Sequence, residues 1–445
     1  MTTSLAPQVS APSADMPRAQ QQAPLTFITC GSVDDGKSTL IGRLLLDSRA
    51  LLQDQLSSAQ RAAGQHAANA VDLASVTDGL SAEREQGITI DVAWRYFSTA
   101  TRKFIIGDSP GHEQYTRNMV TAASQAEAAV VLVDATKVDW QLPLPQLLPQ
   151  TRRHSLLARL LRVPHVVFAV NKLDAVSEPA LAFAHIRAAL QQFTQDADWP
   201  DLHVLPISAL KGHNVVDATP GWAGYDGPSL LQWLERCSPA IEPGADAPAH
   251  FSVQWVEKQH DLAETAHARR ILWGRVLQGS LRVGDRLRIN DGVQAQVASL
   301  RHVRGHLDAA HVATPGDALG VVLDAERDVS RGDALLGLDT PEALREFDAT
   351  VAWLDTQALS VGRSYWALHG HRWVKAKVQA IHHQVNIETL KSEATETLQA
   401  NAIGRVRLKL QTPLPVLPFT ASRALGRLIL VDTATHATAA AVLVD

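Results

Sequence analysis

Cysteine is almost absent from this sequence, which contains only Cys30 and Cys237 among 445 residues. Two thiols cannot build the disulfide framework of a small secreted protein, so a reducing compartment is expected. No apolar run approaches the ~20 residues that span a bilayer. Residues 1–24, rich in Ala, Pro, Gln and Ser, lack the charged start and apolar core of a signal peptide. The sequence therefore predicts a cytoplasmic protein without membrane association, whose first 24 residues form a disordered tail.

An excess of basic residues is also missing. The chain has 41 Lys and Arg against 46 Asp and Glu, which gives a formal net charge of −5. Non-specific nucleic-acid binding depends on neutralising phosphates with basic side chains, so this balance argues against that class of function. The hydrophobic content of 46% is ordinary for a globular protein, and the length suggests two to four domains.

The strongest signal is the stretch GSVDDGKS at residues 31–38, which fits the phosphate-binding pattern G-x-x-x-x-G-K-[ST]. An apolar run at residues 25–30 predicts a buried strand before it, and residues 38–46 have helical spacing after it. In this context the N–H groups at the start of a helix face an anion. Lys37 is predicted to reach the β- and γ-phosphates, and Ser38 to ligate Mg²⁺. The predicted phosphate-binding residues are Gly31, Ser32, Val33, Asp34, Asp35, Gly36, Lys37, Ser38 and Thr39.

Two more motifs follow apolar runs that are typical of buried strands. Asp108, Ser109, Pro110 and Gly111 fit D-x-x-G, in which Asp108 would hold a Mg²⁺-bound water and the Gly111 N–H would touch the γ-phosphate. His112 comes next and is a candidate to position the attacking water; an ordinary surface or core histidine is the alternative.

Residues 171–174 and 208–210 form the predicted base-reading site. The pattern N-K-x-D predicts that the Asp174 carboxylate accepts from guanine N1–H and N2–H₂, donors that adenine does not present in this arrangement. Asn171 supplies the complementary amide, and the Lys172 stem packs on the base. The backbone N–H groups of residues 208–210 can reach guanine O6. The predicted base-binding residues are Asn171, Lys172, Leu173, Asp174, Ser208, Ala209 and Leu210.

Several other residues are candidates for smaller roles. Thr89 is the predicted switch residue, whose hydroxyl completes Mg²⁺ coordination only while the γ-phosphate is present. Arg84 is a candidate internal arginine finger, although an ion pair with a neighbouring glutamate is the favoured interpretation. Asp34 is a candidate ligand for a monovalent cation. Cys30 is interpreted as a buried core thiol. Five histidines lack other metal ligands at suitable spacing and are interpreted as ordinary barrel residues: His302, His306, His311, His382 and His383.

The order of the apolar runs predicts an α/β phosphate-loop GTPase domain with a mostly parallel sheet and helices on both faces. A Pro- and Gly-rich linker at residues 238–248 follows it. Beyond the linker, short strands separated by glycine turns predict two small β-barrels. The predicted boundaries are 1–24 for the tail, 25–240 for the GTP-binding domain, 250–338 for the first barrel and 346–445 for the second.

These motifs resemble those of a known family. Translation-factor GTPases usually have histidine where Ser32 and Asp35 stand here. The variant GSVDDGKST resembles the large GTPase subunit of bacterial heterodimeric sulfate adenylyltransferase, a branch of the translation-factor GTPase superfamily. The segments at 83–93, 111–119, 150–155, 329–333, 362–365 and 380–385 resemble it too.

The resemblance implies a role in sulfate assimilation, towards hydrogen sulfide and cysteine. GTP and Mg²⁺ would be the cofactors, and a small adenylyltransferase subunit the partner in a heterodimer. That partner would join ATP and sulfate into adenylyl sulfate and pyrophosphate, driven by GTP hydrolysis on this chain. The catalytic residues of GTP hydrolysis would be Lys37, Thr89 and His112. Ser109 stands where the family usually has threonine, and residues 138–148 look like an insertion. No second phosphate loop follows, so no adenylyl-sulfate kinase activity is expected.

Two alternatives remain open at the level of the sequence. A translation elongation factor-like GTPase that binds aminoacyl-tRNA would have the same architecture. A GTP-sensing scaffold without catalysis would have the same binding motifs.

Overall fold

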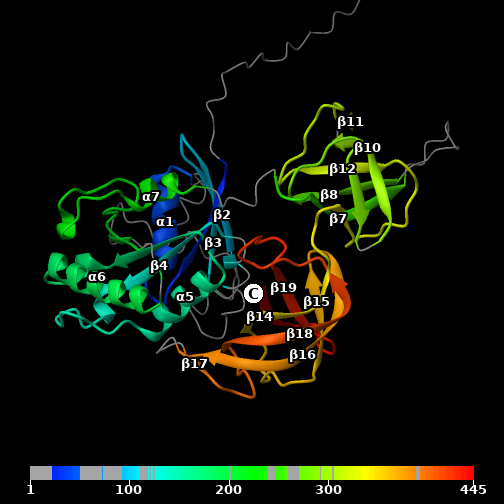
Figure 1. Cartoon of the computed structure of the whole chain (residues 1–445). Helices are drawn as coiled ribbons and strands as arrows, with labels where there is room; N and C mark the ends of the chain where they lie inside the picture. Colours follow the sequence, from blue (N-terminus) through cyan, green and yellow to red (C-terminus); the bar gives the residue numbers. More distant parts are fainter. Residues whose placement is uncertain are drawn as a thin grey trace, which may run out of the picture.

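The computed structural model describes residues 23–50, 73, 93–109, 119, 122–123, 126–197, 199, 202–238, 246–258, 270–290, 292–302, 305–386 and 391–445. Within these residues the strands form three sheets. The first belongs to an α/β unit, and the other two form separate barrels further along the chain (Figure 1).

The α/β unit contains a six-stranded sheet with the order β2-β3-β1-β4-β5-β6. All neighbours pair in parallel except the edge strand β2, which runs antiparallel to β3. The strands are β1 Leu25–Cys30, β2 Ala93–Ser98, β3 Lys103–Asp108, β4 Ala128–Asp134, β5 His165–Asn171 and β6 His203–Pro206. The helices are α1 Lys37–Asp47, α5 Pro149–Leu160, α6 Pro179–Asp196 and α7 Leu230–Arg236, with single turns η2 Ala135–Lys137, η3 Leu173–Ala175 and η4 Trp222–Gly224.

Both faces of this sheet are covered, as the apolar runs predicted. All seven residues of β4 are buried. Val130 and Leu132 belong to the hydrophobic cluster that includes residues of α1 and α7, whereas Val131 and Val133 belong to the cluster that includes residues of α5 and α6. Because successive side chains of a strand point to opposite faces, a run without polar residues requires a helix layer on each side.

The two further sheets close into barrels. In the first, the order β10-β12-β8-β7-β13-β9 closes through a β9–β10 pairing, and β11 adds to β10. In the second, β15-β19-β20-β14-β18-β16 closes through β15–β16, and β17 adds to β16. The strands are β7 His250–Lys258, β8 Arg270–Gln278, β9 Arg286–Ile289, β10 Gln294–His302, β11 Gly305–His306, β12 Ala318–Leu323, β13 Ala334–Gly337, β14 Leu344–Trp353, β15 Ser364–His369, β16 Arg372–Val385, β17 Ser392–Glu393, β18 Ile403–Leu414, β19 Arg427–Asp432 and β20 Thr438–Val444. The predicted fold class is confirmed.

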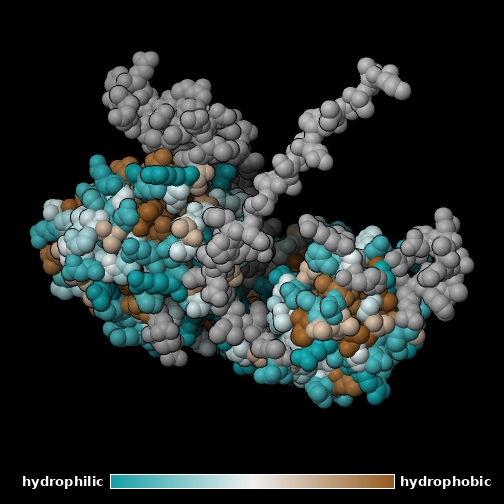
Figure 2. Space-filling model, turned by 90° about the horizontal axis from the view of Figure 1, so that it is seen from above, coloured by the Kyte–Doolittle hydropathy of each residue, from teal (hydrophilic) through white to brown (hydrophobic). Residues whose placement is uncertain are grey.

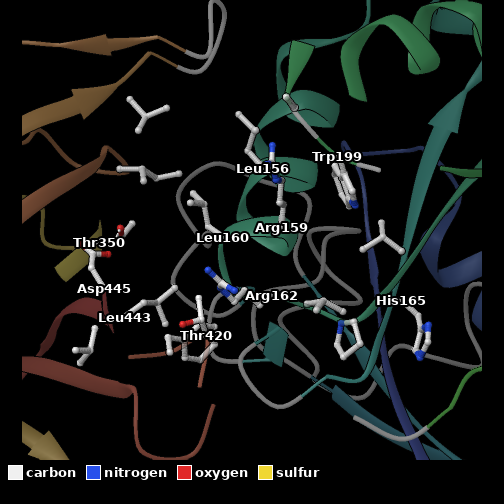
Figure 3. Close-up of a pocket in the computed structure, with 18 of the residues that line it drawn as sticks. Leu156, Arg159, Leu160, Arg162, His165, Trp199, Thr350, Thr420, Leu443 and Asp445 are labelled. Atoms are coloured by element: carbon white, nitrogen blue, oxygen red, sulfur yellow. Dashed lines mark hydrogen bonds between the residues drawn. The ribbon is translucent and has the colours of Figure 1, made fainter. Parts of the chain in front are cut away.

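The second barrel packs against the α/β unit. Its residues Leu354, Ile403 and Ala441 belong to the same buried cluster as the α5–α6 face of the sheet, and Arg423 donates to the carbonyl of Ala126 at 3.2 Å. Beside this contact lies a cavity of about 1100 Å³. Figure 3 shows it between residues of the α/β unit, such as Arg159 and Arg162, and barrel residues such as Thr350 and Leu443.

On the face seen in Figure 2, hydrophilic residues prevail on the left-hand unit, and hydrophobic residues gather in a patch on the unit at the right. In the described parts of the chain, no helix is both long and apolar enough to cross a bilayer.

Candidate nucleotide-binding site

The predicted motifs lie at one edge of the first sheet, because parallel strands end on the same side. Residues 31–36 follow β1, Asp108 ends β3, Asn171 ends β5 and Ser208 follows β6. These strands are neighbours except for β4, which lies between β1 and β5. Ligands bind at this edge in open α/β sheets. The fold therefore brings the predicted phosphate and base motifs to one place.

The phosphate-binding loop has the backbone that its glycines allow. Gly36 has φ +94° and precedes α1, and Asp34 has φ +61°. A Cβ atom on Gly36 would lie 2.5 Å from Asn171 Nδ2. Gly36 therefore provides both a left-handed conformation and room for the base motif.

Lys37 lies inside the loop and is 7% exposed. Its Nζ donates to the carbonyls of Gly31 at 3.2 Å and Ser32 at 2.7 Å. Burial lowers the pKa of Lys37, while the nearby carboxylates of Asp108 and Asp35 oppose this shift. An ammonium group has three donors, so two carbonyl contacts leave one for a ligand. This placement fits the predicted contact with a phosphate.

Asn171 joins the two halves of the site. It is 2% exposed, and its Nδ2 donates to the Asp35 carbonyl at 2.8 Å while its Oδ1 accepts from the Ala209 N–H at 3.0 Å. The Ala209 N–H, one of the backbone groups of residues 208–210 that are expected to reach guanine O6, is thus bonded to Asn171 in this structure. Asp174 is exposed in the turn η3. Its carboxylate has no hydrogen bond or ion pair within the described residues, which leaves it available to a base.

An ion pair between Lys172 and Asp134 lies next to the phosphate-binding loop. Lys172 Nζ donates to the Asp34 carbonyl at 2.5 Å and pairs with Asp134 at 2.8 Å. Asp134, fully buried at the end of β4, also accepts from Thr136 N–H at 2.9 Å. Although burial alone would raise it, these hydrogen bonds leave the pKa of Asp134 below its usual value. The sequence reasoning missed Asp134, although it ends an apolar run in the same way as Asp108.

His154 is a second residue that the sequence reasoning did not single out. It is fully buried on α5, and its Nδ1 accepts from the Gly31 N–H at 3.2 Å. Burial lowers the pKa of His154 to about 3, with nearby Lys37 adding to the shift, so the ring is neutral. The first N–H of the phosphate-binding loop is therefore held by a helix 123 residues further along the chain.

Oxygen donors suited to Mg²⁺ lie close to the loop. Asp108 is 4% exposed and accepts from Thr29 Oγ1 at 3.2 Å. Ser109 donates to the Thr29 carbonyl, and the Ser38 hydroxyl is half-buried at the start of α1. Mg²⁺ at phosphate sites takes only one or two protein oxygens, with phosphates and water completing the shell. The donor set of Ser38 and Asp108 fits this ion.

Five of the predicted residues have no described position. Thr89, Arg84, Pro110, Gly111 and His112 lie outside the described residues. In the described part of the chain, no group of three or more His, Cys, Asp or Glu is placed so that it could hold a metal. Both cysteines are free and buried, which confirms the interpretation of Cys30; burial raises the Cys30 pKa to about 12, so the thiol is protonated.

Comparison with known proteins also indicates GTP binding by the α/β unit. Residues 23–240 match the family model of the elongation factor Tu GTP binding domain, and residues 346–445 match the GTP-eEF1A C-terminal domain-like model. Sulfate adenylyltransferase subunit 1 of Laribacter hongkongensis (strain HLHK9) is 42% identical over 420 aligned positions, and the alignment covers 93% of this chain and 83% of that protein. The protein of the same name from Citrobacter koseri is 42% identical over 454 aligned positions, and the alignment covers 100% of this chain and 91% of that protein.

Some relatives are longer than this chain. The bifunctional enzyme NodQ of Azospirillum brasilense is 44% identical over 422 residues, and the alignment spans 94% of this chain but 65% of NodQ. Among solved structures, sup35 complexed with GDP aligns with 21% identity and a TM-score of 0.40, covering 97% of each chain. The nucleotide-binding edge of the sheet, the two barrels and the near full-length similarity agree: the chain belongs to the sulfate adenylyltransferase subunit 1 family, within the translation-factor GTPase superfamily.

Proposed function

We propose that this chain is the GTP-hydrolysing subunit of a sulfate adenylyltransferase. GTP hydrolysis here drives the formation of adenylyl sulfate and pyrophosphate from ATP and sulfate on a small partner subunit. The observation that carries the proposal is Asn171, which ties the phosphate-binding loop to residues 208–210 in a chain whose relatives are named as subunit 1 of this enzyme.

Guanine selectivity rests on Asp174. Its carboxylate is exposed beside the residues that Asn171 holds together, and it can accept from guanine N1–H and N2–H₂. Adenine would leave it without these donors, and losing a charged hydrogen bond of this kind costs about 1.5–3 kcal/mol. The nucleotide bound by this chain is therefore GTP, and ATP is the partner's substrate.

Hydrolysis follows from the groups around the triphosphate. Lys37 and the N–H groups at the start of α1 bind the phosphates, and Ser38 and Thr89, with Asp108 acting through a water, would hold Mg²⁺. When bound, the ion neutralises phosphate charge. The Gly111 N–H contacts the γ-phosphate and His112 orients the attacking water. Thr89 and Gly111 would both lose a partner when the γ-phosphate is cleaved, and this loss would couple GTP hydrolysis to the partner's active site.

Formation of adenylyl sulfate tests the proposal directly. The chain is co-expressed with the small subunit, and pyrophosphate release from ATP and sulfate is followed with and without GTP. GTP should raise the yield of adenylyl sulfate and be hydrolysed during the reaction. In a complex with Lys37→Ala, GTP should have no effect, while the partner keeps its uncoupled activity. Equal yields with and without GTP would contradict the proposal.

Because the matching family model is that of elongation factor Tu, tRNA delivery is the second candidate function. Titration with aminoacyl-tRNA in the presence of a GTP analogue separates the two. Tight GTP-dependent tRNA binding would favour the translation factor. A scaffold that only senses GTP would show no turnover with the partner, ATP and sulfate present.

A further inference from the structure

Asp35 places a negative charge inside the loop that is to receive a triphosphate. The residue is fully buried, and its Oδ2 accepts from the Ser32 N–H at 2.5 Å. Burial raises the pKa of Asp35, but hydrogen bonding and charge attraction from Lys137 oppose this shift. A carboxylate here repels phosphates unless a cation compensates it, since charges interact strongly where water is excluded.

Lys137 is the cation that contacts this carboxylate. Its Nζ lies 3.0 Å from Asp35 Oδ1 and also donates to the Val33 carbonyl. It belongs to the turn η2, directly after β4, so its position is fixed by a central strand of the sheet. Its side chain is 35% exposed, so the pair is partly shielded from water.

The neighbouring lysines have other partners. Lys172 pairs with Asp134 at 2.8 Å, whereas Lys137 lies 3.8 Å from that carboxylate. Lys37 adds positive charge near Asp35, but its Nζ bonds to the carbonyls of Gly31 and Ser32. Compensation of Asp35 by direct contact therefore comes from Lys137.

We propose that Lys137 is a positioning residue for nucleotide binding. It neutralises Asp35 and holds the Val33 carbonyl, so that the triphosphate meets a loop whose shape is set and whose carboxylate is balanced. The inference rests on the proposed GTP site and adds a residue to it that lies outside the recognised motifs.

A charge-balancing role and a merely structural role predict different results for a second-site change. Lys137→Met leaves the Asp35 charge unbalanced and should weaken nucleotide binding. Adding Asp35→Asn removes that charge, while the asparagine oxygen still accepts from the Ser32 N–H. If charge balance is the function of Lys137, the double variant recovers binding. If the pair only supports folding, the double variant remains as weak as the single one.

The experiment measures the affinity of the full chain for GDP and for a non-hydrolysable GTP analogue by calorimetry at low and high salt. Lys137→Met should weaken analogue binding at least ~10-fold, because the buried Asp35 carboxylate loses the cation that contacts it. The affinity for GDP should decrease less, because GDP carries less negative charge than the analogue. Added salt should reduce the difference in affinity between Lys137→Met and wild type. The double variant should return to within ~3-fold of wild type, and Lys137→Arg should retain most of the affinity.

Lys103→Met, which changes an exposed lysine at the start of β3, is the matched control and should bind like wild type. Thermal unfolding of each variant shows that the fold is kept; if Lys137→Met does not fold, Lys137→Arg and the double variant carry the test. Wild-type affinity in Lys137→Met, or a double variant as weak as Lys137→Met, would overturn this inference alone. A wild-type chain that binds neither guanine nucleotide would overturn the proposed function, and this inference with it.

Discussion

Replacing Gly36 with alanine tests whether the two halves of the site are joined as the structure shows. The new Cβ would lie 2.5 Å from Asn171 Nδ2, far inside van der Waals contact. Asn171 would have to leave its bonds to the Asp35 carbonyl and the Ala209 N–H, which measure 2.8 and 3.0 Å. The substitution therefore acts on the phosphate loop and the base-binding loop at once.

The expected cost has two parts. An alanine at φ +94° stands in the left-handed region, which costs about 1–2 kcal/mol. Two buried hydrogen bonds contribute about 0.5–1.5 kcal/mol each. The sum is about 2–5 kcal/mol, and if it falls on the nucleotide-binding conformation, affinity for GTP decreases roughly 30-fold to several thousand-fold.

The assay is calorimetric titration of GTP analogue into Gly36→Ala, with Gly284→Ala as the control. Gly284 has nearly the same φ, +96°, but a Cβ there would meet nothing within 4 Å. The control separates backbone strain from the contact with Asn171: it should lose about 1–2 kcal/mol of stability and no affinity. If Gly36→Ala bound the analogue as well as the Gly284→Ala control, the role assigned to Asn171 would be wrong.

Three other changes have defined outcomes. Lys37→Ala should abolish GTP binding in a calorimetric titration, since the buried ammonium that bonds to the carbonyls of Gly31 and Ser32 would be lost. Asp174→Asn should shift base preference from guanine towards xanthine nucleotides; unchanged guanine selectivity in competition binding would remove Asp174 from base reading. Burial lowers the pKa of His154 and His250 to about 3 and of His369 to about 4. Above the unfolded pKa of ~6.5, each histidine is neutral in the folded and the unfolded state and costs no stability. Below it, only the unfolded state takes up a proton, so each histidine should lower the free energy of unfolding by about 1.4 kcal/mol per pH unit. Denaturant unfolding at pH 7.5 and 5.5 measures this loss, and equal stability at both values would contradict it.

The parts of the fold that the sequence predicted well are those encoded locally. Residues 25–46 contain a strand, a glycine-bounded loop and a helix in succession, and the structure has β1 and α1 there. The buried strands β4 and β5 were also predicted from local sequence, because each is a continuous apolar run. Barrel strands were predicted less fully: the sequence indicated only short strands between glycine turns, whereas β8, Arg270–Gln278, is nine residues long. Burial along β8 does not alternate strictly, since Ile271 and Leu272 are both buried, and this weakens the period-2 signal of a strand.

The supporting residues of the site could not be predicted because their contacts are distant in sequence. Lys137 and His154 reach the phosphate-binding loop over 102 and 123 residues. Neither belongs to a short motif with a known spacing from Gly31. Their positions depend on where β4 and α5 lie relative to β1, which is a property of the assembled sheet. Asp134 is different, since a polar residue at the end of an apolar run already marks the ligand-binding edge.

Asn171 shows why phosphate and base recognition are not independent in this protein. A residue that only read the base could be changed without moving the phosphate loop. Here the same amide holds the Asp35 carbonyl and the Ala209 N–H, so movement of either loop is transmitted to the other. Lys172 acts in parallel, because it joins the Asp34 carbonyl to Asp134 at the end of β4. Loss of the γ-phosphate would therefore change the contacts with the base as well. A partner that contacts either loop would change the affinity for the whole nucleotide.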